Sequence, residues 1–320
     1  MIRIAQCVPN ISEGRDQKKI DFITEPLRID SNFKFISAEP DKDYNRTVIT
    51  LLGDPELMMP ALLEFFKRAK DSIDMNVHKG EHPRMGAVDV CPFIPISNIT
   101  IEECVDYAKK LAEEVSSLHD IPVFLYAKAA QDPSRINLPD IRKGEFEGMI
   151  EKIKDPLWKP DFGPAHIHPT FGAVAIGARI PLVAFNIDLP TMDEKIASNI
   201  AKAIRQSSGG FQHIQAGPAT LLEKGHVQVT MNILDFKKNP IYRILETVKM
   251  EAQRYQLEIK TTEIIGLLPK EAITDSLKYY YAVHQLTWDK NISMEELNTQ
   301  AIKYLKFRDF DRLKIIEANI

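Results

Sequence analysis

The second half of the chain alternates between apolar runs of strand length and apolar repeats of helical period. Residues 180–187 form a short continuous apolar run, which is typical of a buried strand. Ile196, Ile200 and Ile204 then recur every four residues, and this spacing predicts an amphipathic helix. The later predicted elements are strands at 211–216 and 227–234, a helix from 240 to 252 and a strand at 258–265. This order is the split-βαβ, or ferredoxin-like, arrangement.

The first half repeats the same order of elements. Strands are predicted at 2–8, 33–38, 47–52 and 88–96, and helices at 17–27 and 54–73. We therefore expect an α/β protein of the α+β type, built from two ferredoxin-like subdomains that form layered α/β sandwiches. The expected domains are 1–179 and 180–320, the second with a helical tail. An extension of the first contains a helix at 102–115, a strand at 122–126 and a polar segment that reaches about residue 161.

Composition and charge narrow the class of protein. The 320 residues are 44% apolar and 27% charged, enough to form two packed domains. A net charge of −4 argues against a nucleic-acid-binding surface, and residues 227–234 lack the stacking aromatic side chains of an RNA-recognition strand. We find no signal peptide or membrane-spanning segment, and Cys7, Cys91 and Cys104 are scattered as in proteins of a reducing compartment. We expect a cytoplasmic protein without membrane or nucleic-acid partners.

The densest group of reactive side chains lies at 78–92, just before a predicted strand. His78 and His82 have a spacing that binds metal on a helix, but Gly80 and Pro83 oppose a helix here. Acid–base catalysis by one imidazole is better supported, because histidine titrates near neutral pH. For each ring the alternative is a structural role, and this alternative is favoured more strongly for His78 than for His82. We expect no metal site.

Residues 161–173 join the two predicted halves and contain two glycines, two prolines and two histidines. Such a segment suits either the wall of a ligand cleft at a domain junction or a tight linker. His166 and His168 have no obvious third metal ligand nearby in the sequence, so a hydrogen-bonding role toward a ligand is favoured over a metal site.

Six segments together carry a family resemblance. They are 7–14, 45–48, 78–95, 138–147, 161–179 and 184–186. The most specific of them is the run His78-Lys79-Gly80-Glu81-His82-Pro83-Arg84-Met85-Gly86. On these six segments, the chain resembles the glutamate formimidoyltransferase family. The chain contains no G-x-S-x-G elbow, P-loop or Rossmann glycine motif, which disfavours the enzyme classes that use them.

The resemblance implies a homodimer with a folate-binding groove between the two subdomains of each chain. The resemblance also implies the activity of the protein. It would transfer a formimidoyl group from N-formimidoyl-L-glutamate to N5 of tetrahydrofolate, the co-substrate, in histidine degradation. The family's catalytic histidine maps onto His82. The folate-contacting segment maps onto Gly163, Pro164, Ala165, His166, Ile167, His168, Pro169, Thr170, Phe171 and Gly172. A separate formimidoyltetrahydrofolate cyclodeaminase is an expected partner, because animal relatives carry that domain fused.

The predicted chemistry needs one imidazole to move a proton between two nitrogens, with Glu39 or Asp89 holding the ring. We expect that ring at the mouth of an inter-domain crevice, not in a dry core. Arg84 first, then Lys79, Arg46 and Arg179, are candidates to bind the carboxylates of the anionic substrates. Asn10 and Glu39 complete the predicted substrate and folate site. The alternatives are transfer from another donor, such as formimidoylglycine or formylglutamate, and a folate-binding protein without catalysis.

Overall fold

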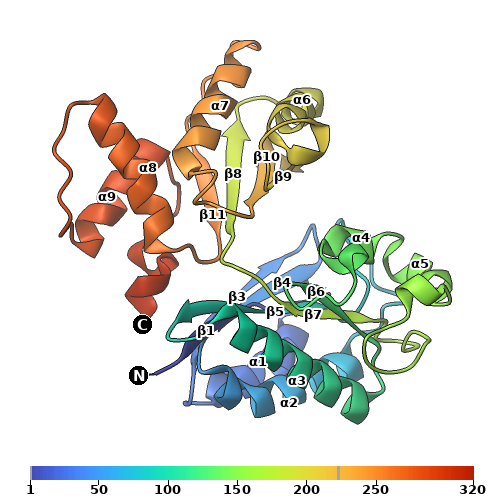
Figure 1. Ribbon diagram of the computed structural model, residues 1–320. Helices are drawn as coiled ribbons and strands as arrows, with labels where there is room; N and C mark the ends of the chain where they lie inside the picture. The colour runs from blue at the N-terminus through green and yellow to red at the C-terminus, as the bar shows by residue number, and fades with distance from the viewer. Residues whose placement is uncertain (1, 222–223) are drawn as a thin grey trace. The chain divides into compact units, whose positions relative to one another are not determined.

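The structure is a computed structural model that describes residues 2–221 and 224–320 (Figure 1). It divides into two compact units, Met1–Ile180 and Pro181–Ile320. Each unit has its own hydrophobic core. Among the described residues, no helix has both the length and the apolar character needed to cross a bilayer.

The second unit contains a four-stranded antiparallel sheet in the order β11-β8-β10-β9. Its elements are β8 (Val183–Leu189), α6 (Glu194–Ile204), β9 (Ile214–Leu221), β10 (His226–Ile233), α7 (Ile241–Gln253), β11 (Thr262–Ile265), α8 (Lys270–Val283) and α9 (Met294–Leu305). The six elements from β8 to β11 appear in the predicted order. Helix α6 packs against β9 and β10, and the residues of its apolar stripe belong to the same core as the buried face of the strands. Helix α8 was not predicted.

The first unit contains a seven-stranded sheet in which β1 (Ile4–Cys7) and β2 (Asn10–Ile11) each pair with β4 (Arg46–Gly53) and β5 (Val88–Ser97). The other elements are α1 (Gln17–Ile29), β3 (Lys34–Asp41), α2 (Pro55–Ser72), α3 (Ile101–His119), β6 (Val123–Ala127), α4 (Leu138–Arg142), α5 (Glu145–Lys152) and β7 (Val174–Ala178). The predicted order holds from β1 to β5, with the first strand interrupted. Strand β7 then pairs in parallel with both β5 and β6.

The extension of the first unit agrees with the prediction only in part: α3 and β6 lie where a helix and a strand were expected. The segment expected to be polar and without elements contains α4 and α5, which have five and eight residues. The junction segment runs directly into β7, whose sequence Val-Ala-Ile-Gly-Ala has little of the β-branched character that marks a strand. Short helices and a glycine- and alanine-rich strand give almost no periodic signal, so the pattern could not reveal them.

One face of the larger sheet is only partly covered. Helices α1, α2 and α3 lie on the opposite face (Figure 1) and bury the core there. Directly paired residues of neighbouring strands share a face. One such row runs across the sheet through Glu39, Val48, Asn10, Val90, Ala175 and Phe124. Helices α4 and α5 cover its Val90–Phe124 end, whereas Glu39, Val48 and Asn10 stay partly exposed.

The loop between α2 and β5 follows a path that only glycine permits. A Cβ atom at Gly80 would overlap the carbonyl oxygen of Tyr44, and one at Gly86 would overlap that of Ala173. Backbone hydrogen bonds fix this contact: Ala87 N–H donates to Phe171 O at 2.8 Å, and Ala173 N–H donates to Met85 O at 3.0 Å. The sheet therefore anchors the loop that carries both histidines.

Gly86→Ala should lower the free energy of unfolding by about 2–3 kcal/mol, because the added methyl group meets a fixed backbone oxygen that has no room to move. Gly148→Ala is the matched control: its Cβ would meet nothing within 4 Å, and alanine in α5 should stabilise by about 0.5–1 kcal/mol. Urea unfolding of the variants measures both. Equal stability of Gly86→Ala and the natural chain would contradict the close packing.

Candidate active site

The site is built around Asp89, a residue that a β-bulge inserts into β5. Ile11 pairs with Val88 and Asn10 pairs with Val90, so Asp89 is the one extra residue on this strand. A bulge breaks the alternation of the strand and redirects a side chain. Here it places a carboxylate with no solvent exposure among polar groups.

Asp89 has three partners. Its Oδ1 accepts a hydrogen bond of 2.9 Å from the backbone N–H of Met85, and its Oδ2 pairs with Nη2 of Arg142 and lies 3.5 Å from Nε2 of His82. Burial alone raises the pKa of a carboxyl, but the charge of Arg142 and the contact with His82 lower the pKa of Asp89 to about 2. Asp89 is therefore an anion at neutral pH.

His82 is held against this anion in its neutral form. The side chain is 5% exposed, and burial lowers the pKa of His82, with the positive charges of Arg142 and Arg46 acting in the same direction and Asp89 opposing them. The separation of 3.5 Å between Nε2 of His82 and Oδ2 of Asp89 is too long for a good hydrogen bond, and this buried nitrogen has no other hydrogen-bond partner among the described residues. A neutral imidazole beside a fixed carboxylate is the arrangement of a general base, because the carboxylate stabilises the imidazolium that forms.

The burial of His82 bears on one expectation. The side chain is almost fully enclosed, and the position of the ring at an inter-domain crevice stays a prediction. Its neighbours are charged, not apolar: Asp89 touches it, and Arg142 and Arg46 act on it electrostatically. The pocket around the ring is thus enclosed but polar.

His78 has a different environment and a structural role. Its Nδ1 accepts a 3.2 Å hydrogen bond from Nε of Arg84, so its other nitrogen, Nε2, carries the proton that is donated to Asn45 O at 2.9 Å. Burial lowers the pKa of His78, which keeps the ring neutral. His78 and His82 thus have separate partners. Among the residues that the structure describes, no three His, Cys, Asp or Glu side chains are grouped as metal ligands would be.

Arg84 connects this loop to α5. All five of its N–H groups are engaged, two by His78 and three by the carboxylates of Glu145 and Glu147. The guanidinium is buried while both carboxylates are about half exposed, and this pairing lowers the pKa of Glu147. A substrate carboxylate would have to replace one of these bonds, so the predicted contact between Arg84 and substrate requires a local rearrangement.

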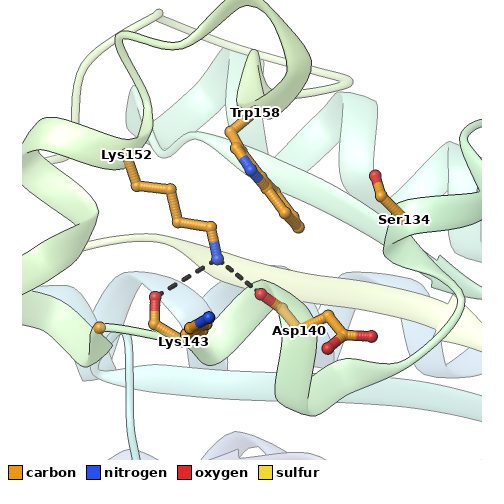
Figure 2. Close-up of a pocket in the computed structure, with 6 residues that line it drawn as sticks. Ser134, Asp140, Lys143, Lys152 and Trp158 are labelled. Atoms are coloured by element: carbon orange, nitrogen blue, oxygen red, sulfur yellow. Dashed lines mark hydrogen bonds between the residues drawn. The ribbon is translucent and has the colours of Figure 1, made fainter.

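A lysine fixes the turn between α4 and α5. Nζ of Lys152 donates to the carbonyl oxygens of Asp140, Ile141 and Lys143 at the end of α4, and it lies 3.8 Å from the centre of the Trp158 ring. Figure 2 shows this lysine beside the indole and above the end of the helix, in a hollow of about 570 Å³. Because Arg142 is the last residue of α4, Lys152 positions the guanidinium that pairs with Asp89.

The predicted folate segment is only partly associated with this site. Its end joins the histidine loop, because Gly172 bridges to Gly86, three residues before Asp89. Its beginning packs elsewhere: Gly163 lies against Ser116 and Ile121 near the end of α3. Between them lie Pro164, Ala165 and Ile167, of which Ala165 is exposed.

The histidines of this segment differ in their surroundings. Nδ1 of His168 accepts hydrogen bonds from the backbone N–H groups of Thr170 (3.3 Å) and Phe171 (3.0 Å), which closes a tight turn. His166 is exposed, and Pro169 accepts a hydrogen bond from the Asn76 side chain. Phe171 is fully buried in the core. The exposed positions are the ones available to a ligand.

The remaining predicted residues lie on the open part of the sheet or near it. Glu39 and Asn10 lie in the same row of the sheet with Val48 between them, and no described hydrogen bond or ion pair joins Glu39 to His82. Of the two carboxylates proposed to hold the ring, Asp89 is the one in contact with it. Arg179, after β7, interacts with the buried Tyr126, and burial lowers the pKa of this guanidinium.

Sequence reasoning missed Arg142. It lies 53 residues from Asp89 in the sequence, in a segment that was predicted to have no helix. The one available signal was its place inside 138–147, a segment quoted for the family resemblance. Lys152, Glu145 and Glu147 were likewise not singled out.

Two family models together match nearly the whole chain. The family described as "Formiminotransferase domain, N-terminal subdomain" matches residues 4–179, and the "Formiminotransferase domain" matches residues 184–319. A protein of Streptococcus pyogenes serotype M1 called glutamate formimidoyltransferase is 44% identical over 292 residues, which are 91% of this chain and 98% of that relative.

Two further relatives show the family in stand-alone and fused forms. A glutamate formimidoyltransferase of Thermoplasma acidophilum is 42% identical, covering 87% of this chain and 92% of the relative. The formimidoyltransferase-cyclodeaminase of Mus musculus is 40% identical over 88% of this chain, but the match spans 53% of that protein. Both subdomain families match in order, and these relatives align along most of the sequence, so the chain belongs to the formiminotransferase family.

Proposed function

We propose that this chain is an enzyme that transfers the formimidoyl group of N-formimidoyl-L-glutamate to N5 of tetrahydrofolate, its co-substrate, with release of L-glutamate. Family membership and the names of the relatives at 44% and 42% identity support this reaction. The observation that carries the mechanism is the neutral imidazole of His82 held beside the ionised Asp89. Histidine degradation is the metabolic setting that the donor implies.

The transfer requires a proton to move from one nitrogen to another. The N5 secondary amine attacks the amidine carbon, and a new C–N bond gives a tetrahedral adduct. His82 accepts the proton that N5 loses, and Asp89 stabilises the resulting imidazolium. His82 then returns the proton to the glutamate nitrogen as the old C–N bond breaks. General acid–base catalysis of this kind contributes ~10²–10⁴-fold, and holding both substrates together adds to it.

The enclosure of His82 sets a condition on this mechanism. With 5% of the side chain exposed, the reacting nitrogens reach the ring only if the histidine loop or the α4–α5 segment moves aside. The α4–α5 segment is the better candidate, because it consists of two short helices held to the loop by Arg142 and by the half-exposed Glu145 and Glu147. Opening there would admit substrate and closing would exclude water.

The other predicted features belong to the same proposal. Gly163 to Gly172 would contact folate, with Asn10 and Glu39 on the adjoining sheet face. A homodimer in the cytoplasm, with three unpaired cysteines in the described part of the chain, is consistent with this function. Relatives that join the transferase to a cyclodeaminase support such an enzyme as a separate partner. No observation favours formimidoylglycine, formylglutamate or a purely folate-binding role.

His82→Gln should lower the turnover number by ~10²–10⁴-fold while folding and tetrahydrofolate binding persist, because glutamine forms hydrogen bonds but does not accept the proton. Assay of formimidoylglutamate with tetrahydrofolate, together with fluorescence titration of folate binding, measures both. His119→Gln is the matched control, because His119 is a partly buried histidine whose described side-chain hydrogen bond is to the carbonyl oxygen of Leu63, and this variant should retain activity. Normal turnover of His82→Gln would remove His82 from the mechanism.

The pH profile of kcat/KM should also follow His82. Because burial lowers the pKa of His82 below its ordinary value of 6.5, its neutral form persists below that pH, and the acid limb should lie below pH 6.5. Asp89→Asn removes the charge that partly raises the pKa of His82, so the limb should move to still lower pH while kcat falls. Asp193→Asn, at a helix N-cap in the second unit, is the control. An acid limb that moves upward in Asp89→Asn would contradict the pairing.

A further inference from the structure

Two arginines beside the His82–Asp89 pair have hydrogen-bonding capacity that the described protein does not use. The Nε atoms of Arg46 and Arg142 are both buried, and neither has a hydrogen-bond partner among the residues described. A buried donor without a partner is costly, so in native proteins ordered water or a ligand usually fills the position. Two such donors on neighbouring guanidinium groups indicate a binding site.

The two side chains approach the same place from different elements. Arg46 begins β4 and lies on the partly exposed sheet face, two residues before Val48 in the row described above. Arg142 ends α4 and pairs with Asp89, with 16% of its side chain exposed. Burial lowers the pKa of Arg46, and the charge of Arg142 adds to this effect. The site thus lies where the cover formed by α4 and α5 ends.

The unused Nε donors at this place favour an anion, and Asp89 and Asp41 offset only part of the positive charge of the two arginines. Asp89 is the carboxylate that pairs with Arg142, and it also faces His82. Arg46 has Asp41 as its cross-strand neighbour, but Asp41 accepts the backbone N–H groups of Asp43 and Tyr44. Two guanidinium groups placed close together repel each other unless an anion lies between them, and a carboxylate matches their planar donors.

We propose that Arg46 and Arg142 bind the α-carboxylate of the formimidoyl donor. This inference rests on the proposed function and adds the group that recognises the donor. The α-carboxylate is separated by a single carbon from the nitrogen to which His82 returns the proton, so it must lie near the base. The glutamate of the folate tail lies beyond the aminobenzoyl ring from N5 and is too far from the reacting nitrogen. Arg142 touches Asp89, which touches His82, so a carboxylate bound by Arg142 would lie close to the base, as the α-carboxylate of the donor must.

The donor therefore should be selected by its α-carboxylate. Formimidoylglycine retains that group and lacks the γ-carboxylate, whereas the formimidoyl derivative of 4-aminobutyrate retains the γ-carboxylate and lacks the α-carboxylate. We expect the natural chain to use the 4-aminobutyrate derivative at least ~10-fold less well in kcat/KM than formimidoylglutamate, because two charge-assisted contacts are lost. The loss should be smaller for the glycine derivative.

The decisive experiment compares these donors in Arg46→Met, which leaves the Asp89–Arg142 pair intact. We expect kcat/KM to fall ~10–100-fold for formimidoylglutamate and to change little for the 4-aminobutyrate derivative. Arg142→Lys keeps the positive charge next to Asp89 but loses the planar donors, and should show the same selective loss. Arg254→Met, at a surface ion pair of the second unit, is the matched control. An equal loss for both donors, or no loss for either, overturns the proposal.

Binding measurements with glutamate and 4-aminobutyrate test the carboxylate site independently of the proposed transfer reaction. Calorimetric titration with L-glutamate should give at least ~10-fold tighter binding than 4-aminobutyrate in the natural chain, and Arg46→Met should abolish the difference. If the natural chain transfers no formimidoyl group but shows this Arg46-dependent selectivity, the reaction is wrong and the carboxylate site stands. If transfer occurs and the selectivity does not depend on Arg46, the reaction stands and the carboxylate site is wrong.

Discussion

One buried carboxylate holds the candidate site together. Asp89 has no exposed surface, yet it binds the backbone of the histidine loop, the guanidinium of Arg142 and, more loosely, the ring of His82. Removing one partner of a buried ion pair costs ~3–5 kcal/mol, since the other charge stays behind without compensation. The bulge in β5, the path of the loop and the position of α4 therefore depend on each other through this side chain.

A second ionic centre fixes the same loop from its other side. Arg84 ties the loop to α5 through Glu145 and Glu147, and it also fixes the tautomer of His78. The two histidines of the loop therefore have different roles: His78 supports the loop, and His82 lies beside the charge that lets it accept a proton. Both ionic centres depend on α4 and α5, so movement of this short segment would alter the environment of both rings. The segment that completes the site is thus the same segment that would have to move for substrate to reach His82.

The sequence was most informative where periodicity is strong. The apolar repeat of α6 and the alternation of β10 are long enough to predict both elements, and the order of elements followed from them. Strand β7 and helix α4 are short, and three of the five residues of β7 are alanine or glycine, so tertiary packing and not local preference decides their conformation. In the extension of the first unit, α3 and β6 were therefore predicted, whereas α4, α5 and β7 were not.

The candidate site was predictable in part for a related reason. The composition of the loop at 78–92 pointed to His82, because the reactive side chains are adjacent in sequence. The partners of these side chains are not: Arg142 is 53 residues from Asp89, and Glu147 is 63 residues from Arg84. A bulge that shifts one strand by a residue leaves no trace in the hydrophobic pattern. The hydrophobic pattern also could not show that all the N–H groups of Arg84 have partners, whereas Nε of Arg46 has no hydrogen-bond partner among the described residues.

The central claim is that the protein holds His82 neutral beside an anionic Asp89 at neutral pH. Nitrogen-15 NMR of the imidazole, with His82 assigned by comparison with a variant lacking it, reports protonation directly over a pH titration. The account predicts a neutral ring at pH 7 and a midpoint below 6.5, because burial outweighs the attraction of Asp89. A ring that is cationic at pH 7, with a midpoint above 6.5, would contradict it.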